Sequence, residues 1–204
     1  MASPVSHIIY AKKYLEKHPM NKADEEMFFL GCLFPDIRRI DPKISRKETH
    51  LFFPDLNLDA NGLDSFHFGW KFHLYCDMKR EEILNRKNFY SLKNTKDFWG
   101  ISAKSLEESL IYSEYNNWEK LINFLNNAPF IETSINVSRE TFGLWYAILA
   151  KYFEKKPDQK SVRIFLAKQP ALSEINRDIV RSMDKLGKNG KVIEILSRVK
   201  DEII

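Results

Sequence analysis

The sequence predicts an all-α protein that forms a single domain over residues 1–204. Glycine and proline are scarce, with 7 and 8 among 204 residues, and this composition favours long helices over tight hairpins. Several segments carry apolar residues at the i, i+3, i+4 spacing of an amphipathic helix. No segment has the regular alternation of apolar and polar residues that is typical of a half-buried strand. A chain of this length suits one hydrophobic core.

The N-terminal part of the chain predicts two helices. The first begins at Ser6, which is expected to cap it, and ends before Pro19, because a residue that precedes proline disfavours the helical conformation. The second covers about residues 23–33 and is stopped by Pro35. This ending leaves the acidic side chain of Asp36 directly after an apolar helix, at a buried edge.

Residues 37–61 are expected to form a long loop, because they contain three pairs of turn-forming residues. These pairs are Asp41-Pro42, Pro54-Asp55 and Asn61-Gly62. A third helix is expected over about residues 63–85. The residues that share one face of this helix are Phe66, Gly69, Trp70, His73 and Asp77. A glycine in such a face predicts a close approach by another helix.

The rest of the chain, residues 86–204, predicts additional helices and carries no motif that indicates chemistry. One helix is expected over about residues 102–125 and another over about 138–153. The tail is expected to form two short helices separated by Gly187 and Gly190. These segments are expected to wall a pocket or to form a surface for a partner.

Composition excludes several functional classes. The 32 basic and 28 acidic residues nearly cancel to a net charge of +4, with no dense basic tract of the kind that binds nucleic acid. No apolar run reaches the length of about 20 residues that spans a membrane. The N-terminal segment lacks the pattern of a secretory signal, so a cytoplasmic location is expected. Cys32 and Cys76 each lie in an apolar stretch and are expected to be buried thiols rather than a disulfide.

The distribution of histidine indicates a metal site. All five histidines lie within the first 73 residues. His73 and Asp77 stand four residues apart on the third helix, so both side chains can reach one ion. The alternative is a simple hydrogen bond between these two side chains within the helix. Their face is otherwise apolar, and a buried charge there is costly unless it is paired or bound to metal.

Three further residues are candidate ligands, although each has an ordinary structural alternative. Asp36 follows the second helix, where an aspartate in a turn is common. His50 lies beside the apolar cluster at residues 51–53 and could be a core histidine that is satisfied by hydrogen bonds. His7 lies in the first turn of the first helix, where a surface histidine is also common.

Four short motifs together resemble the zinc-dependent phospholipase C family, whose fold is shared with zinc-dependent single-strand nucleases. In order along the chain they are SHI at 6–8, GCLFPDI at 31–37, THLFF at 49–53 and FHFGWKFHLYCD at 66–77. The resemblance covers residues 6–77, a little over a third of the chain. It implies a phospholipase C/nuclease-like multi-helix bundle with a metal site in its core cleft.

The resemblance also implies a role for each candidate ligand. Asp36, His50, His73 and Asp77 would hold one metal ion, while Asp77 would bridge to a second ion that His7 also holds. The expected cofactors are therefore one or two divalent ions, with Zn²⁺ expected first and Mn²⁺ or Fe²⁺ as alternatives. Asp36 and Asp77 would be the catalytic carboxylates.

The implied reaction is hydrolysis of a phosphodiester or a phosphomonoester by a metal-activated water. The expected partner is a phosphate-ester substrate, such as a phospholipid or a small phosphodiester. Arg38 and Arg39 would bind a phosphate oxygen, and the related nucleases have an arginine at the position of Arg39. The alternative is that both arginines are simply solvated.

The chain departs from the family in two respects. It has six residues before His7 and no tryptophan among them, whereas the secreted members use an N-terminal tryptophan as a ligand. It also lacks any histidine after His73, so the family's third metal site is missing or rebuilt. Glu114 is a candidate for an additional acid, and an exposed helical glutamate is the alternative. Two other functions stay open: a non-catalytic helical protein with a vestigial metal site, and a nuclease.

Overall fold

The computed structural model describes residues 3–50, 52–53, 55–60 and 62–204, and within these ranges all regular structure is helical. The prediction of an all-α protein is therefore confirmed. Leu51 of the third motif and the expected loop residues Pro54 and Asn61 lie outside the described residues. The helices are α1 Pro4–Lys17, α2 Lys22–Leu33, η1 Phe34–Arg39, α3 Arg46–His50, α4 Ser65–Arg86, η2 Phe89–Ser91, η3 Asp97–Gly100, α5 Ile101–Ile111, η4 Tyr112–Glu114, α6 Trp118–Asn126, α7 Arg139–Phe153, α8 Gln159–Ala167, η5 Pro170–Leu172, α9 Asn176–Leu186 and α10 Gly190–Glu202.

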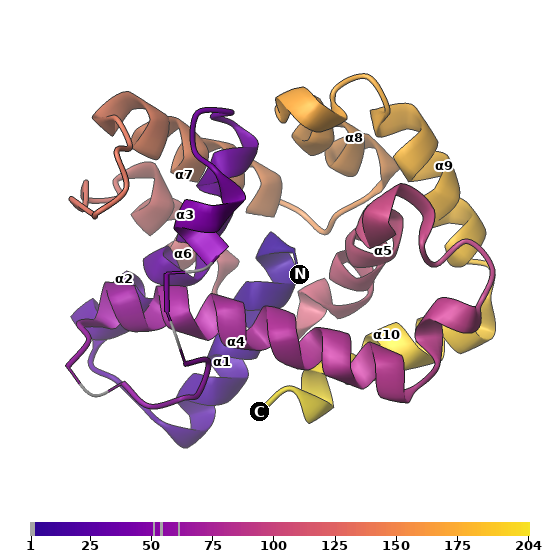
Figure 1. Cartoon of the computed structure of the whole chain (residues 1–204), viewed down its shortest axis with the longest axis horizontal. Coiled ribbons are helices and arrows are strands. Elements are labelled where there is room, and N and C mark those ends of the chain that lie inside the picture. The colour runs from indigo at the N-terminus through magenta and orange to yellow at the C-terminus, as the bar shows by residue number, and fades with distance from the viewer. Residues whose placement is uncertain (1–2, 51, 54, 61) are drawn as a thin grey trace.

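The long helix α4 crosses the molecule and is contacted by elements from both halves of the chain (Figure 1). Helix α2 packs along its N-terminal half, and α10 contacts it as well. Its expected apolar face is buried in the core. Because α4 lies at the centre of the fold, side chains near its middle are held by packing on several sides.

Helix α1 begins earlier than predicted. Its N-cap is Ser3, and Pro4 occupies the first helical position, where a residue without an N–H group is well tolerated. Ser6 lies inside the helix and is fully buried, so the expected cap at Ser6 was wrong. The fixed φ of proline sets the start of the helix here, and His7 remains in its first turn.

Helices α2 and α4 approach so closely that their backbones touch at two glycines. A Cβ atom added to Gly31 would lie 1.9 Å from the carbonyl oxygen of Phe66, and one added to Gly69 would lie 2.1 Å from that of Phe28. No larger residue fits either position without backbone movement. The close approach predicted at Gly69 is confirmed, and it fixes α2 against the N-terminal half of α4.

The expected loop over residues 37–61 is partly helical. The 3-10 helix η1 continues directly from α2 and contains Asp36, and the short helix α3 ends at His50. A capping box begins α3, because the Ser45 amide donates to the Glu48 carboxylate over 2.8 Å while the Glu48 amide donates to the Ser45 hydroxyl over 3.2 Å. The indole of Trp70 then ties α3 to α4 by donating to the Thr49 carbonyl over 2.7 Å.

The second half of the chain differs from the prediction in two places. The helix expected over 102–125 is divided into α5 and α6, since Tyr115 is extended and Asn117 also departs from helical geometry. Helix α8 was not predicted, although Asp158 and Ser161 form a capping box at its start. The helix expected over 138–153 and the two tail helices are confirmed as α7, α9 and α10.

Helix α7 fixes the C-terminal end of α2. The indole of Trp145 donates to the Leu33 carbonyl over 2.9 Å, and the hydroxyl of Tyr146 donates to the Leu30 carbonyl over 2.8 Å. Both carbonyls belong to the last turn of α2, where the helix cannot satisfy them internally.

A separate property of the fold is that no helix in the described residues combines the length and apolarity needed to cross a membrane.

Candidate metal centre

The five side chains that the sequence predicts as ligands lie together at the middle of α4. Helix α1 supplies His7, η1 supplies Asp36, α3 supplies His50, and α4 supplies both His73 and Asp77. They form two overlapping groups, His7–His73–Asp77 and Asp36–His50–His73. Within each group one ligand atom per residue lies within 4.8 Å of the others, a spacing that could hold a metal ion. These buried groups confirm that the described chain has a possible metal site.

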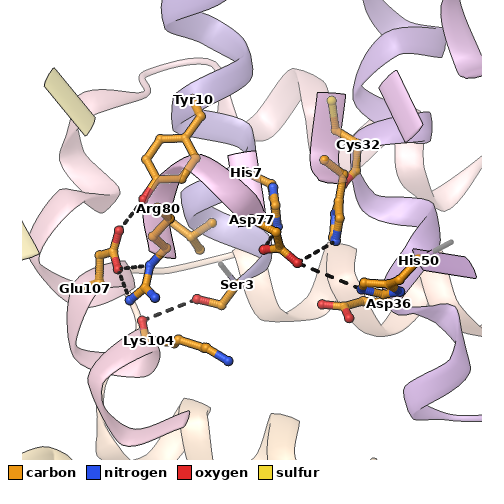
Figure 2. A network of polar contacts seen from close by, with 12 residues as sticks. Ser3, His7, Tyr10, Cys32, Asp36, His50, Asp77, Arg80, Lys104 and Glu107 are labelled. Atoms are coloured by element: carbon orange, nitrogen blue, oxygen red, sulfur yellow. Dashed lines mark hydrogen bonds and ion pairs between the residues drawn. The ribbon is translucent and has the colours of Figure 1, made fainter. Parts of the chain in front are cut away.

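The carboxylate of Asp77 lies at the centre of the cluster. Its Oδ1 atom is 3.5 Å from Nε2 of His7, and its Oδ2 atom is 3.9 Å from Nε2 of His50 and 3.7 Å from Nε2 of His73. Figure 2 shows this carboxylate between the labelled His7 and His50 side chains. Each of the three imidazoles thus directs its Nε2 atom at the carboxylate of Asp77. These distances are too long for ordinary hydrogen bonds and leave room for a cation between the donors.

Backbone and hydroxyl groups orient two of the imidazoles. Nδ1 of His73 donates to the carbonyl of Cys32 over 2.8 Å. Nδ1 of His50 lies 2.8 Å from the Thr49 hydroxyl. Both rings are held with Nε2 directed at the cluster, and in His73 this nitrogen is unprotonated because Nδ1 carries the proton. An outer hydrogen bond of this kind is typical of histidines that bind metal.

The inward nitrogens of His7, His50 and His73 are buried and have no hydrogen-bond partner among the described residues. An unsatisfied buried polar atom is costly and calls for a partner such as an ion. Burial lowers the pKa of His50 to about 4 and that of His73 to about 3, so both rings are neutral at pH 7 and have a free lone pair. The donor set therefore fits a divalent cation.

The orientation of His73 limits how the ligands can be shared. Its Nδ1 is committed to the Cys32 carbonyl, so only Nε2 remains, and one imidazole nitrogen binds one cation. The two groups therefore cannot each use His73 for a separate ion. An ion that takes His73 with Asp36 and His50 leaves His7 and one oxygen of Asp77 for a second ion.

Arg39 lies directly behind the cluster. Its Nε atom is 2.8 Å from Oδ1 of Asp36, and the side chain is 12% exposed. Burial alone would raise the pKa of Asp36, but this guanidinium outweighs it and holds the pKa well below its usual range. Nη1 of Arg39 is 3.5 Å from Oε1 of Gln169. The ion pair keeps Asp36 charged and fixes which of its sides faces the imidazoles.

Three other residues considered at the level of sequence lie outside the cluster. Glu114 is 44% exposed and lies 3.6 Å from Nζ of Lys200, so the structure does not bring this acid to the metal ligands. His67 pairs with Asp64 at the start of α4, and His18 stacks on Tyr14 at the end of α1. Neither histidine belongs to the two groups of possible ligands in the described residues.

Sequence reasoning missed the polar face of α5 beside the cluster. Lys104, Glu107 and Glu108 recur at i, i+3, i+4, a pattern that usually marks a solvated face, yet all three are buried. Glu107 accepts two hydrogen bonds from the Arg80 guanidinium, over 2.8 and 2.6 Å, and one from Tyr10. Figure 2 shows this network next to the donor cluster. The helical spacing of Lys104, Glu107 and Glu108 was the only feature of the sequence that pointed to this network.

Glu108 anchors α1 to α5. Its carboxylate accepts hydrogen bonds from the Val5 amide over 2.8 Å and from the Tyr152 hydroxyl over 2.7 Å. Burial raises the pKa of Glu108 to about 7, and these hydrogen bonds lower it only in part. The contact satisfies an N-terminal amide of α1 and places His7, two residues further on, against α4.

Comparisons of the chain with family models, with curated proteins and with solved structures find no match.

Proposed function

We propose that this protein is a metal-dependent phosphoesterase with a phospholipase C/nuclease-like arrangement of its helices. The observation that carries the proposal is the convergence of three imidazoles and two carboxylates in the core, with the inward imidazole nitrogens unsatisfied among the described residues. The order of the four motifs along the chain, similar to that of the zinc-dependent phospholipase C family, supports the same conclusion. Zn²⁺ suits this mixture of nitrogen and oxygen donors, as do Mn²⁺ and Fe²⁺.

His7, Asp36, His50, His73 and Asp77 would hold the cation or cations. A divalent cation bound there lowers the pKa of water and polarises a phosphoryl oxygen, which is the chemistry that phosphate-ester hydrolysis needs. The chain itself contributes the position of the substrate. Arg39 is fixed by Asp36, and its Nη2 atom is buried without a hydrogen-bond partner among the described residues, so it is available to a phosphate oxygen.

Metal content and turnover test the proposal together. The protein is purified in metal-free buffer, loaded with Zn²⁺, Mn²⁺ or Fe²⁺, analysed for bound metal, and assayed with p-nitrophenyl phosphate and bis(p-nitrophenyl) phosphate. We expect one or two ions per chain and turnover that Asp77→Asn abolishes. Stoichiometric metal without turnover of either ester would identify a non-catalytic metal-binding protein, which the absence of histidine after His73 favours. A chain that binds no metal would contradict the proposal.

A further inference from the structure

A cavity of about 260 Å³ lies beside the metal centre, and Arg39 separates the two. Three basic side chains, Arg38, Arg39 and Lys104, line it, and none of its lining residues is acidic. Gln169 and several apolar residues complete the lining. These apolar residues are Pro42, Trp99, Ile101, Pro170, Ala171 and Leu172. One cavity thus combines positive charge with apolar surface.

Lys104 is a buried cation that lacks a counterion. The residue is 7% exposed, and its ammonium group makes no hydrogen bond or ion pair with the rest of the described chain. Figure 2 shows its nitrogen directed away from the Glu107 carboxylate. A largely buried side chain whose ammonium group reaches a cavity without a protein partner is well placed to bind an anion there. Burial lowers the pKa of Lys104 to about 8 and still leaves it mostly charged at pH 7.

Arg39 provides a second unsatisfied donor in the same cavity. Its Nε faces Asp36, whereas its Nη2 atom is buried without a hydrogen-bond partner in the described residues. The side chain therefore connects the metal ligands with the cavity. A phosphate that accepts hydrogen bonds from Arg39 and Lys104 would lie next to the metal centre, as an in-line displacement at phosphorus requires.

The aromatic part of the cavity is held by an unusual backbone. Phe98, Trp99 and Gly100 all have positive φ, at 50°, 56° and 72°, and this conformation is unfavourable for the two residues that carry side chains. The turn leaves the Trp99 side chain 76% exposed, which is uncommon for so large an apolar group. Because Trp99 lines the cavity, its exposed indole could stack on a planar or apolar group of a ligand bound there.

From these observations we infer that the cavity binds a small phosphate monoester, with its terminal phosphate on Lys104 and Arg39 and its organic group against Trp99. The inference rests on the proposed function, because it names the substrate class of that site. Three cations in an acid-free cavity favour a dianionic monoester over a monoanionic diester. The volume lies just below that of typical ligand pockets, about 300–1,000 Å³, and suits a phosphate with one ring better than a phospholipid or a polynucleotide.

The reaction that follows from this assignment is simple hydrolysis. The bond between phosphorus and the ester oxygen breaks, and a bond forms between phosphorus and the oxygen of water. One proton from water passes to the departing oxygen, which leaves as an alcohol or a phenol, and the product is inorganic phosphate. No oxidant or reductant is consumed.

Binding of inorganic phosphate tests the role of Lys104 by calorimetry, on metal-loaded and on metal-free protein. We expect Lys104→Gln to raise the Kd for phosphate about tenfold in both forms, since a charge-assisted hydrogen bond is lost. The matched control is Lys93→Gln at an exposed lysine outside the cavity, which should leave the Kd unchanged. Equal affinity in wild type and Lys104→Gln would overturn the assignment.

Thermal unfolding without phosphate separates this role from a structural one. Because Lys104→Gln removes an uncompensated buried charge, its unfolding midpoint should rise while its phosphate affinity falls. A merely structural lysine would show a lower midpoint instead. If the variant does not fold, wild-type protein still decides the question: inorganic phosphate at millimolar concentration should raise its midpoint, and no shift with either phosphate or phenyl phosphate would overturn the assignment.

Phenyl phosphate and diphenyl phosphate test the remaining parts of the inference. Trp99→Ala should weaken phenyl phosphate about fivefold and leave inorganic phosphate unaffected, because only the stacking surface is lost. Equal binding of phenyl phosphate would remove Trp99 from the site, and tighter binding of diphenyl than of phenyl phosphate would overturn the monoester class. Absence of bound metal would instead contradict the proposed function, while the phosphate titrations of metal-free protein would still decide the cavity's role.

Discussion

Nδ1 of His73 donates a hydrogen bond of 2.8 Å to the carbonyl of Cys32, and this contact joins the middle of α4 to the last turn of α2. The carbonyl is accessible because the two helices touch at Gly31 and Gly69. The same close packing thus sets the helix spacing, the tautomer of His73 and the direction of its Nε2. Several expected outcomes depend on this geometry.

Replacing His73 should abolish stabilisation by metal. In wild type, Zn²⁺ at a hundred times its Kd adds about 2.7 kcal/mol to the free energy of unfolding. We expect His73→Ala to lose most of this gain, because His73 belongs to both donor groups. His67→Ala, on the same helix but outside the cluster, should keep it. Urea unfolding with and without Zn²⁺ measures the effect, and an undiminished gain in His73→Ala would refute the site.

Substitution of the contact glycine should be severely destabilising. In Gly69→Ala the new methyl group would meet the backbone of α2, which cannot move aside as a side chain could. We expect a loss of about 3 kcal/mol or more in the free energy of unfolding. The matched control is Gly143→Ala in α7, where an added Cβ meets nothing within 4 Å. That variant should gain up to about 1 kcal/mol from helix propensity, and similar losses in both variants would contradict the close approach.

Glu108 should make the stability of the protein depend on pH in a defined direction. Burial raises its pKa from 4.5 to about 7 in the folded protein, so the folded state favours the protonated form. The stabilisation that protonated Glu108 gives the folded state is fully present below pH 4.5 and is lost as pH rises to about 7. Relative to Glu108→Gln, wild type should therefore lose about 3 kcal/mol between pH 4.5 and pH 8.

Metal-free protein is the sample for this comparison, and urea unfolding of both proteins across that range measures the difference. Taking the difference cancels the other groups that titrate, including the histidines, whose lowered pKa values act in the opposite sense. A difference that does not change with pH would show that folding does not shift the pKa of Glu108.

Loss of the Arg39 guanidinium should lower catalysis while metal stays bound. We expect Arg39→Gln to reduce kcat/KM for p-nitrophenyl phosphate about a hundredfold, because a preorganised donor to the phosphate is removed. Bound metal per chain should be unchanged, since all five ligand side chains remain in this variant. Arg181→Gln, at an exposed arginine that pairs with Asp178, is the control. Loss of metal together with activity would assign Arg39 to the metal site alone.

The sequence predicted well those features that depend on local spacing. His73 and Asp77 were expected on one helical face, and the start of α4 at Ser65 lies within two residues of the expected position. Gly69 predicted the close helix contact before any partner helix was known. Such features follow from the periodicity of a single helix, which needs no knowledge of the tertiary fold.

Features that depend on distant segments were not visible in the same way. The burial of Lys104 arises where α5 packs against α1, a pairing of residues about a hundred positions apart, as the hydrogen bond from Ser3 to its carbonyl shows. The capping boxes of α3 and α8 were present in the sequence but were overlooked beside the prolines and polar residues around them. Asp36 and His50 were weak signals individually, and only the family resemblance joined them to His73.

The burial of the donor atoms has a consequence for how fast an ion can leave. No ligand side chain is more than 10% exposed, and the ligands come from four helical segments that pack on one another, α1, η1, α3 and α4. A chelator must surround the ion with several donor atoms at once, which it could not do until those segments moved apart. The rate of metal exchange would therefore be set by the rate at which the fold opens locally. A protein that keeps its metal on a chelating column would then show that metal release is slow, which is a different property from a low Kd for the metal.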